Sequence, residues 1–529
     1  MLTENVIVKD WRKIEFSFGL IYPNKISVGM SSYSIRLLYF LINSNVNIAC
    51  ERIFLPDDLL LKFPASKDYS SKNVLRSLEN RVLPNEFDIL GFSIHFENDF
   101  KNVLWIIDKA EVPLTTLERQ DGILKDNSKY PILIAGGPAV TSNPIPYSKF
   151  FDILFIGDSE QNLPIFFDLF QNYNERKINY KEFLTRAKNI EGLFIPLLEN
   201  KVKRSVLKNL DESPTPIFQL ISSFPSKKHI FESNFFLEIN RGCPFQCKFC
   251  ISSFHNYPFR NRSYENIINS IQESIQYSNY ETISLIGSCV SSHPKFKQIC
   301  EYIIDKGKRL TIPSIRVEHL TQDIIKVFEK AEIKTITIAP EAGSEIMRYK
   351  LGKKISNEQI ISTLTLIKDS QIKNVKFYFL IGLPNETERD IEAIISLLKS
   401  IDQLGFPKNS LRVNINPFIP KLNTPYQKEI SFFLDDKISE YQRKYQKLEQ
   451  ELKNISSIKL KFKNFKSIIK NARLQTLISL GNQQVSNLLL QYYNNGASLV
   501  GLQKAEKDLN FSLNSYLLKI KECYSPWTI

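Results

Sequence analysis

Short apolar segments alternate with helical stretches along most of this 529-residue chain, and this alternation restricts the fold more than any other feature. In the first third, the apolar segments are residues 14–21, 48–54, 89–93, 132–135 and 153–156, and helices are expected near 32–43, 72–81, 99–110 and 160–172. Short buried strands separated by helices predict a parallel, doubly wound α/β sheet. Ligands of such sheets bind at the carboxyl ends of the strands.

The middle of the chain repeats the same pattern with six strand candidates, at residues 235–239, 282–286, 310–313, 335–339, 373–381 and 411–416. Between the first two, residues 264–277 carry apolar side chains at helical spacing, which predicts a helix with one buried face. Six such units predict a (β/α)6 partial barrel, a fold that gathers its chemistry at the carboxyl ends of the strands.

These patterns divide the chain into four expected parts: a doubly wound domain at residues 1–173, a linker at 174–230, the barrel at 231–430 and an α+β extension at 431–529. Proline spacing and polarity indicate the linker. In the extension, a charged helix is expected at 440–454, a strand with a lysine face at 458–463, and two helices at 471–480 and 484–493.

Three cysteines, Cys243, Cys247 and Cys250, follow the first barrel strand with the spacing C-x3-C-x2-C. Three thiolates on one loop suit a [4Fe-4S] cluster, which has four ligand positions, and leave one iron open to a small molecule. The alternatives are structural zinc, which usually takes four protein ligands in spaced pairs, a disulfide, which would leave one cysteine over, and three unrelated cysteines. The other four cysteines do not cluster, which favours a reducing cytoplasm. Of these, Cys289 is expected in a loop near the barrel mouth and Cys300 in a helix. Both are interpreted as buried apolar side chains; the alternatives are a second cluster and, for Cys289, a catalytic role.

The chain carries a formal net charge of +13, which favours anionic partners such as RNA or phosphorylated compounds. Solvated lysine-rich faces are the alternative interpretation. The amino terminus has no apolar signal-like core, and no apolar run approaches the roughly 18 residues of a membrane span. We therefore expect a cytoplasmic protein without a membrane span.

The cysteine spacing, with the aromatic Phe249 before the last cysteine, resembles the signature of radical S-adenosylmethionine (SAM) enzymes. The resemblance implies that the open iron binds the amino and carboxylate groups of SAM. It also implies that the reduced cluster cleaves SAM to a 5′-deoxyadenosyl radical, with electrons from a reductant such as flavodoxin or ferredoxin.

The resemblance further implies SAM contacts at the ends of the barrel strands, made by Gly287, Ser288, Arg316, Glu341, Arg348 and Gly382. Glu341 matches an acidic position that contacts the ribose, and Gly382 begins a Gly-Leu-Pro-x-Glu-Thr motif on the adenine side. Arg316 or Arg348 could pair with the SAM carboxylate, because guanidinium binds carboxylate through two hydrogen bonds. The alternative is that these glycines only shape turns and that Arg316 and Glu341 form a structural ion pair.

Two loops of the first domain, Gly136-Gly137-Pro138 and Gly157-Asp158-Ser159-Glu160, resemble those of the cobalamin-binding domain found in one class of radical SAM enzymes. The cobalt-ligating Asp-x-His-x-x-Gly motif is missing, and His95 is the only histidine in this third. The chain therefore either binds cobalamin without a protein ligand to cobalt, or keeps the fold without the cofactor.

Taken together, the resemblance implies a radical SAM enzyme that performs cobalamin-assisted methyl transfer, or a related modification, on an unknown substrate. One alternative is an RNA-modifying radical SAM enzyme without cobalamin. The tRNA methylthiotransferases of that kind have three further cysteines in the first domain, where this chain has only Cys50. A non-catalytic iron–sulfur protein that keeps the fold is the other alternative. The sequence identifies no further catalytic residue.

Overall fold

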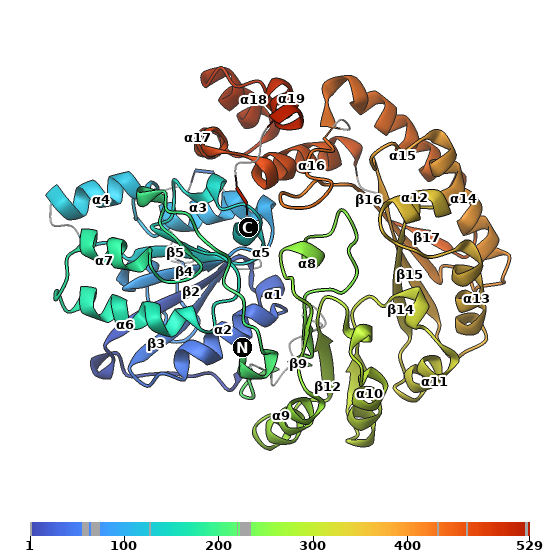
Figure 1. Cartoon of the computed structure of the whole chain (residues 1–529), viewed down its shortest axis with the longest axis horizontal. Coiled ribbons are helices and arrows are strands. Elements are labelled where there is room, and N and C mark those ends of the chain that lie inside the picture. The colour runs from blue at the N-terminus through green and yellow to red at the C-terminus, as the bar shows by residue number, and fades with distance from the viewer. Residues whose placement is uncertain are drawn as a thin grey trace.

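The computed structural model describes residues 3–55, 63–64, 75–125, 129–219, 221–222, 234–430, 433–461, 464–523 and 527–528. A doubly wound domain lies on one side, a partial barrel on the other, and the loop that carries the three cysteines lies between them (Figure 1). No helix of the described residues is long and apolar enough to cross a membrane.

The first domain is built on a six-stranded sheet with the order β3-β2-β4-β5-β6-β7. All neighbouring strands are parallel except β6 and β7. The first five strands have the flavodoxin-like doubly wound order, so the strand order reverses at β2 and β4. The expected doubly wound fold is confirmed. The strands are β2 (Phe16–Lys25), β3 (Ile48–Leu55), β4 (Ile89–Ser93), β5 (Ile132–Gly136), β6 (Ile153–Phe155) and β7 (Leu193–Phe194).

Apolar helix faces cover both sides of this sheet. The helices α2 (Tyr33–Asn43), α6 (Asn162–Asn174) and α7 (Tyr180–Ala187) share a core with one face. Helix α3 (Phe100–Lys109) packs on the other face, and α4 (Thr116–Lys125) follows it in the chain. Because β7 belongs to the sheet, the segment expected as a linker from residue 174 begins inside this domain.

The helix expected at residues 72–81 is not formed in its described part, residues 75–81, and residues 72–74 lie outside the described residues. The segment turns back instead. The Ser77 hydroxyl donates a hydrogen bond to Glu51 (2.6 Å), the Asn80 side chain donates to the same carboxylate (2.6 Å), and Arg81 has φ +62°. Tertiary hydrogen bonds to β3 therefore override the local helical pattern.

The barrel consists of two parallel groups of strands, β13-β12-β9 and β14-β15-β16-β17. A backbone hydrogen bond from Ile315 to Thr337 (2.9 Å) connects the two groups. The six expected strands are present and the partial barrel is confirmed; β17 adds a further parallel strand beside the sixth. The strands are β9 (Asn234–Glu238), β12 (Thr282–Ile286), β13 (Arg309–Thr311), β14 (Thr335–Glu341), β15 (Asn374–Ile381), β16 (Leu411–Pro417) and β17 (Ile458–Leu460).

Helices pack around these strands and, apart from α12, share one apolar core with them, while Met347 of α12 belongs to a separate small cluster. Helix α9 has the bounds expected from its apolar spacing. Helix α15, in the segment expected as an extension, packs into this core. The helices are α9 (Tyr264–Tyr277), α10 (Phe296–Asp305), α11 (Gln322–Lys330), α12 (Glu345–Lys350), α13 (Asn357–Lys368), α14 (Glu388–Asp402) and α15 (Ile438–Leu452).

The last helices, α16 (Phe465–Leu480), α17 (Gln483–Asn494), α18 (Leu499–Asp508) and α19 (Leu513–Cys523), return to the first domain. Leu477 and Leu488 are fully buried in the core that also contains α3, and the Asn143 side chain donates to the carbonyl of Gly481 (2.8 Å). Figure 1 shows α16 above the gap between sheet and barrel. The carboxyl-terminal part of the chain therefore joins the two larger bodies.

Candidate functional site

The three cysteines lie on one long hairpin loop. Its stems are the short antiparallel strands β10 (Asn240–Arg241) and β11 (Arg260–Asn261), and it contains the short helix α8 (Ile251–Phe254). Gly242 opens the loop with φ +79°, and a Cβ there would lie 2.4 Å from the carbonyl oxygen of Asn256. Only glycine allows the two ends of the loop to approach so closely.

The Cys247 thiol is buried, and those of Cys243 and Cys250 are half-buried. Cys250 lies within electrostatic range of both other thiols. Within the described ranges, no three His, Cys, Asp or Glu side chains are grouped closely enough to hold a single metal ion. Three thiols on one loop are the donor set that an iron–sulfur cluster takes.

Cationic side chains face the Cys247 thiol. Burial raises the pKa of Cys247, while the positive charges of Lys353 and Arg316 act in the opposite direction. The Lys353 ammonium lies 3.2 Å from the carboxylate of Glu341 and hydrogen-bonds the carbonyl of Ala339. These charges favour an anionic, thiolate-bound group at this position. Sequence reasoning missed Lys353, which follows no recognised motif.

Arg316 and Glu341 come together at the cysteine loop but do not pair with each other. The Arg316 guanidinium stacks 3.6 Å above the ring centre of Phe245, a residue of the loop, and pairs with Glu318 at 2.5 Å. Its Nε is buried without a hydrogen-bond partner among the described residues. Glu341 has φ +68° and pairs with Lys353. The structural ion pair between Arg316 and Glu341, given above as the alternative, is therefore not formed.

Arg348 is fully buried, and protein groups take up its guanidinium. Its guanidinium donates hydrogen bonds to the carbonyls of Ala342, Gly343 and Ile355 and to the side chain of Asn357. All three guanidinium nitrogens have protein partners, so Arg348 is not placed to bind a carboxylate. Of the two arginines that the sequence offered for this role, only Arg316 faces the loop.

Three other residues expected to bind the cofactor lie in or beside the barrel. Phe249 packs on an apolar cluster that includes Met347 and Leu351. Gly287 lets Asn240 approach, since a Cβ would lie 2.1 Å from the Asn240 Oδ1 atom, and Ser288 next to it is exposed.

Gly382 has φ +81° and donates its N–H to Glu386 (3.0 Å). The loop from Gly382 to Glu386 lines a cavity of about 330 Å³ with residues of α15.

Cys289 lies in a loop near the barrel mouth, as expected, and contacts a cysteine of the site. Its thiol is buried and hydrogen-bonds Cys243, and this bond lowers the pKa of Cys289. Ser292 is 3.1 Å from the same sulfur, and the neighbouring Ser291 contacts His319 Nδ1 at 2.7 Å. Cys300 is fully buried in the barrel core, as expected.

In the first domain, the glycines at the strand ends serve close backbone packing. A Cβ on Gly137 (φ +105°) would lie 2.7 Å from the carbonyl of Ile94, and one on Gly157 (φ +98°) would lie 2.1 Å from that of Ser205. A Cβ on Gly136 would meet Phe155 at 3.3 Å. None of these glycines therefore requires a ligand to explain its conformation.

His95 lies at the carboxyl end of β4, where it faces two serine hydroxyls. Its Nε2 is 2.8 Å from the Ser34 hydroxyl and 3.2 Å from that of Ser93, and burial lowers the pKa of His95 to about 4. Cys50 is the one cysteine of residues 1–173 in the sequence, and it is buried in β3. Hydrogen bonds thus hold the imidazole in place.

Comparison with known proteins identifies the class of the chain. The radical SAM superfamily profile matches residues 237–398, and the profile for the N-terminal region of radical SAM proteins matches residues 34–196. The chain therefore belongs to the radical SAM superfamily and consists of a radical SAM domain preceded by that N-terminal domain.

Among individual relatives, uncharacterized protein MJ0966 of Methanocaldococcus jannaschii is 28% identical over 94% of this chain and 96% of its own length. A tRNA-2-methylthio-N(6)-dimethylallyladenosine synthase of Clostridium botulinum is 26% identical over 43% of this chain and 52% of its own.

Two solved structures of the radical SAM methyltransferase TsrM from Kitasatospora setae share the fold. The one with cobalamin and a [4Fe-4S] cluster bound has TM-score 0.53 and 12% identity, and covers 78% of this chain and 77% of TsrM. The one with tryptophan and a SAM analogue bound has TM-score 0.55 and 10% identity, and covers 93% and 99%.

Proposed function

We propose that Cys243, Cys247 and Cys250 ligate a [4Fe-4S] cluster and that the protein uses SAM in cobalamin-assisted methyl transfer, or a related modification, of an unidentified substrate. When bound and reduced, such a cluster supplies the electron that cleaves SAM to a 5′-deoxyadenosyl radical. The observation that carries the proposal is the hairpin loop itself, which holds three thiols after the first barrel strand, beside Lys353 and Arg316.

The side chains around the loop have separate roles in this proposal. Lys353 and Arg316 offset the negative charge that thiolates and cluster bring into a partly buried site. The unpartnered Nε of Arg316 is a donor for the SAM carboxylate, because arginine binds carboxylates at two nitrogens. Glu341, held by Lys353, is an acceptor for ribose hydroxyls.

Unpaired polar atoms at the carboxyl ends of β4 and β5 support cobalamin binding. Asp99 Oδ1 accepts a hydrogen bond from Asn24 (2.8 Å), but Asp99 Oδ2, Asn98 Oδ1 and the Tyr147 hydroxyl are buried without partners among the described residues. Buried polar atoms in native proteins nearly always have partners. These three unpaired atoms lie near the point where ligands of doubly wound sheets bind. The amide side chains of cobalamin could supply the missing hydrogen bonds.

The test is anaerobic reconstitution of the full chain with iron and sulfide, with and without hydroxocobalamin. We expect close to four irons per chain, 5′-deoxyadenosine that depends on dithionite and SAM, and co-purifying corrinoid absorbance. Cys247→Ala should lose the cluster. Cys50→Ala is the matched control and should keep it, because Cys50 lies in the sheet of the first domain. A full cluster in Cys247→Ala would refute the ligand assignment, and absent corrinoid binding would refute the cobalamin part alone.

A further inference from the structure

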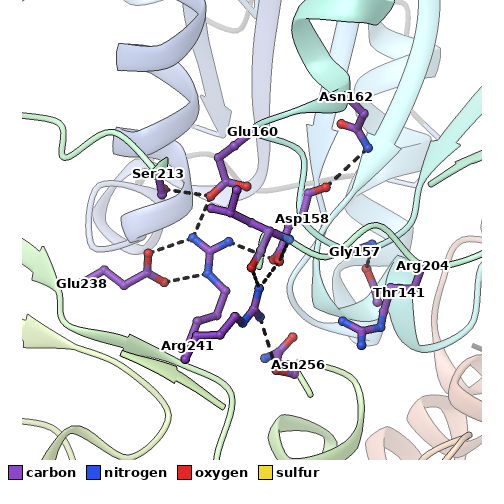
Figure 2. Close-up of polar contacts among 12 residues, drawn as sticks. Thr141, Gly157, Asp158, Glu160, Asn162, Arg204, Ser213, Glu238, Arg241 and Asn256 are labelled. Carbon is purple, nitrogen blue, oxygen red and sulfur yellow. Dashed lines mark hydrogen bonds and ion pairs between the residues drawn. The ribbon is translucent and has the colours of Figure 1, made fainter. Parts of the chain in front are cut away.

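The carboxylate of Asp158, in the first domain, holds both stems of the hairpin that carries the cysteines. Arg241 on β10 lies 2.9 Å from Asp158 Oδ1, and Arg260 on β11 lies 2.6 Å from Oδ2. Arg241 and Arg260 are directly paired in the hairpin register. Figure 2 shows the Arg241 guanidinium between the carboxylates of Asp158, Glu160 and Glu238. A single carboxylate therefore closes the base of the cysteine loop.

Hydrogen bonds within the first domain also hold Asp158 in place. Its backbone N–H donates to the carbonyl of Ser205 (3.0 Å), and its Oδ2 accepts the backbone N–H of Leu207 (2.9 Å). The preceding Gly157 donates its N–H to the Thr141 hydroxyl (3.1 Å). The carboxylate thus has a set direction at the carboxyl end of β6, and its position follows that of the first domain.

Two further carboxylates pair with Arg241. Glu160, also in the first domain, lies 2.7 Å from its guanidinium, and Glu238, at the end of β9, lies 2.8 Å from it. The Arg241 side chain is 13% exposed, Glu160 6% and Glu238 8%. Charges buried to this extent are costly to leave unpaired, so a small movement of the hairpin relative to the first domain would break ion pairs that water does not yet replace.

We propose that Asp158 is a positioning residue for the cluster, which acts by holding the stems of the cysteine loop in register against the first domain. The cysteine loop is then ordered from outside the barrel, by a residue 83 positions before one stem and 102 before the other. Only the identification of this loop as the cluster-binding loop rests on the proposed function.

The test compares Asp158→Asn with Asp152→Asn in the full chain. Asp152 lies at the opposite end of the same strand, β6, and makes its own buried ion pair with Arg119 (3.0 Å). Both variants lose one buried charge of the first domain, but only Asp158 touches the hairpin. The asparagine at 158 presents an amide NH₂ to one of the two arginines, so that contact becomes repulsive.

The first readout is hydrogen–deuterium exchange of the apo-protein over residues 240–261, which needs no cluster. We expect protection there to fall by about tenfold or more in Asp158→Asn, as for other broken buried ion pairs, and to stay at the wild-type level in Asp152→Asn. Asp158→Glu, which keeps the charge, should restore part of the protection. Equal protection in wild type and Asp158→Asn would overturn the proposal, whether or not a cluster binds.

The second readout is the reconstituted protein, in which we compare iron release to a chelator and the change in the electron paramagnetic resonance spectrum on adding SAM. A loosened loop should release iron about threefold faster or more and give a broadened spectrum. Asp152→Asn should match wild type in both. If wild type binds no cluster, the proposed function fails, and the exchange measurement still decides the role of Asp158.

Discussion

Acidification should open the cysteine loop through His255, the residue that ends helix α8. The His255 side chain is 3% exposed, its Nε2–H donates to the carbonyl of Leu422 (2.7 Å), and its Nδ1 has no partner among the described residues. Burial lowers the pKa of His255 to about 4 from 6.5, and the nearby Lys421 and Arg204 act in the same direction. Protonation would therefore place an unpaired positive charge in the buried contact between the cysteine loop and the segment around Leu422.

The folded pKa lies below the unfolded value, so this stabilisation is present above pH 6.5 and is lost as the pH falls towards 4. For a local opening that exposes the imidazole, a drop from pH 7.5 to pH 5 costs the closed form about 2 kcal/mol. This corresponds to about a 30-fold increase in the opening equilibrium.

Hydrogen–deuterium exchange at the two pH values measures this change, with protection factors corrected for the intrinsic rate at each pH. Wild type should lose protection in residues 251–258, and His255→Gln, which does not titrate, should lose much less. His95→Gln is the control, because the pKa of His95 is also lowered to about 4 but His95 lies at the end of β4. An equal loss in wild type and His255→Gln would refute the reasoning.

Three further substitutions test the packing around the site, each measured by urea unfolding. Burial raises the pKa of Glu386 to about 7 from 4.5, so Glu386 contributes stability below pH 4.5 that is lost as the pH rises through 7. Glu386→Gln should therefore gain up to about 3 kcal/mol relative to wild type between pH 5 and pH 8, and a difference that is constant with pH would contradict this. Arg348→Met leaves three buried carbonyls without donors and should cost about 3 kcal/mol or more; a near-neutral effect would show that water replaces the guanidinium. Leu477→Ala should cost about 2–5 kcal/mol, because Leu477 is fully buried between α16 and the first domain; a cost below that range would mean that α16 carries little of this interface.

The ion pairs at the base of the hairpin involve a loop that the sequence assigned to a different role. Asp158 and Glu160 belong to the loop that the sequence assigned to cobalamin binding, and the structure uses both carboxylates to hold Arg241. The unpaired atoms of Asp99 and Tyr147 lie instead after β4 and β5. A ligand bound at Asp99 and Tyr147 would therefore contact the first domain through the loops after β4 and β5. The cysteine loop contacts the same domain through the loop after β6.

The sequence by itself determined the features that depend on local spacing. Buried strands appear as short apolar runs, and amphipathic helices show apolar residues at helical spacing. The alternation of these two patterns along the chain predicts the doubly wound sheet and the partial barrel. The C-x3-C-x2-C spacing places three thiols on one loop within eight residues. Even the added strand β17 was visible in the alternation of residues 458–463, of which residues 462 and 463 lie outside the described residues.

The tertiary structure alone decided everything that depends on contacts between distant residues. Arg316 and Arg348 look equivalent in the sequence, but the fold buries Arg348 among carbonyls and stacks Arg316 on the cysteine loop. Asp158 meets its two arginines across 83 and 102 residues, a distance over which no local pattern carries information. The physical reason is that a charged side chain has no fixed partner until packing removes the water around it and leaves one counter-charge within reach.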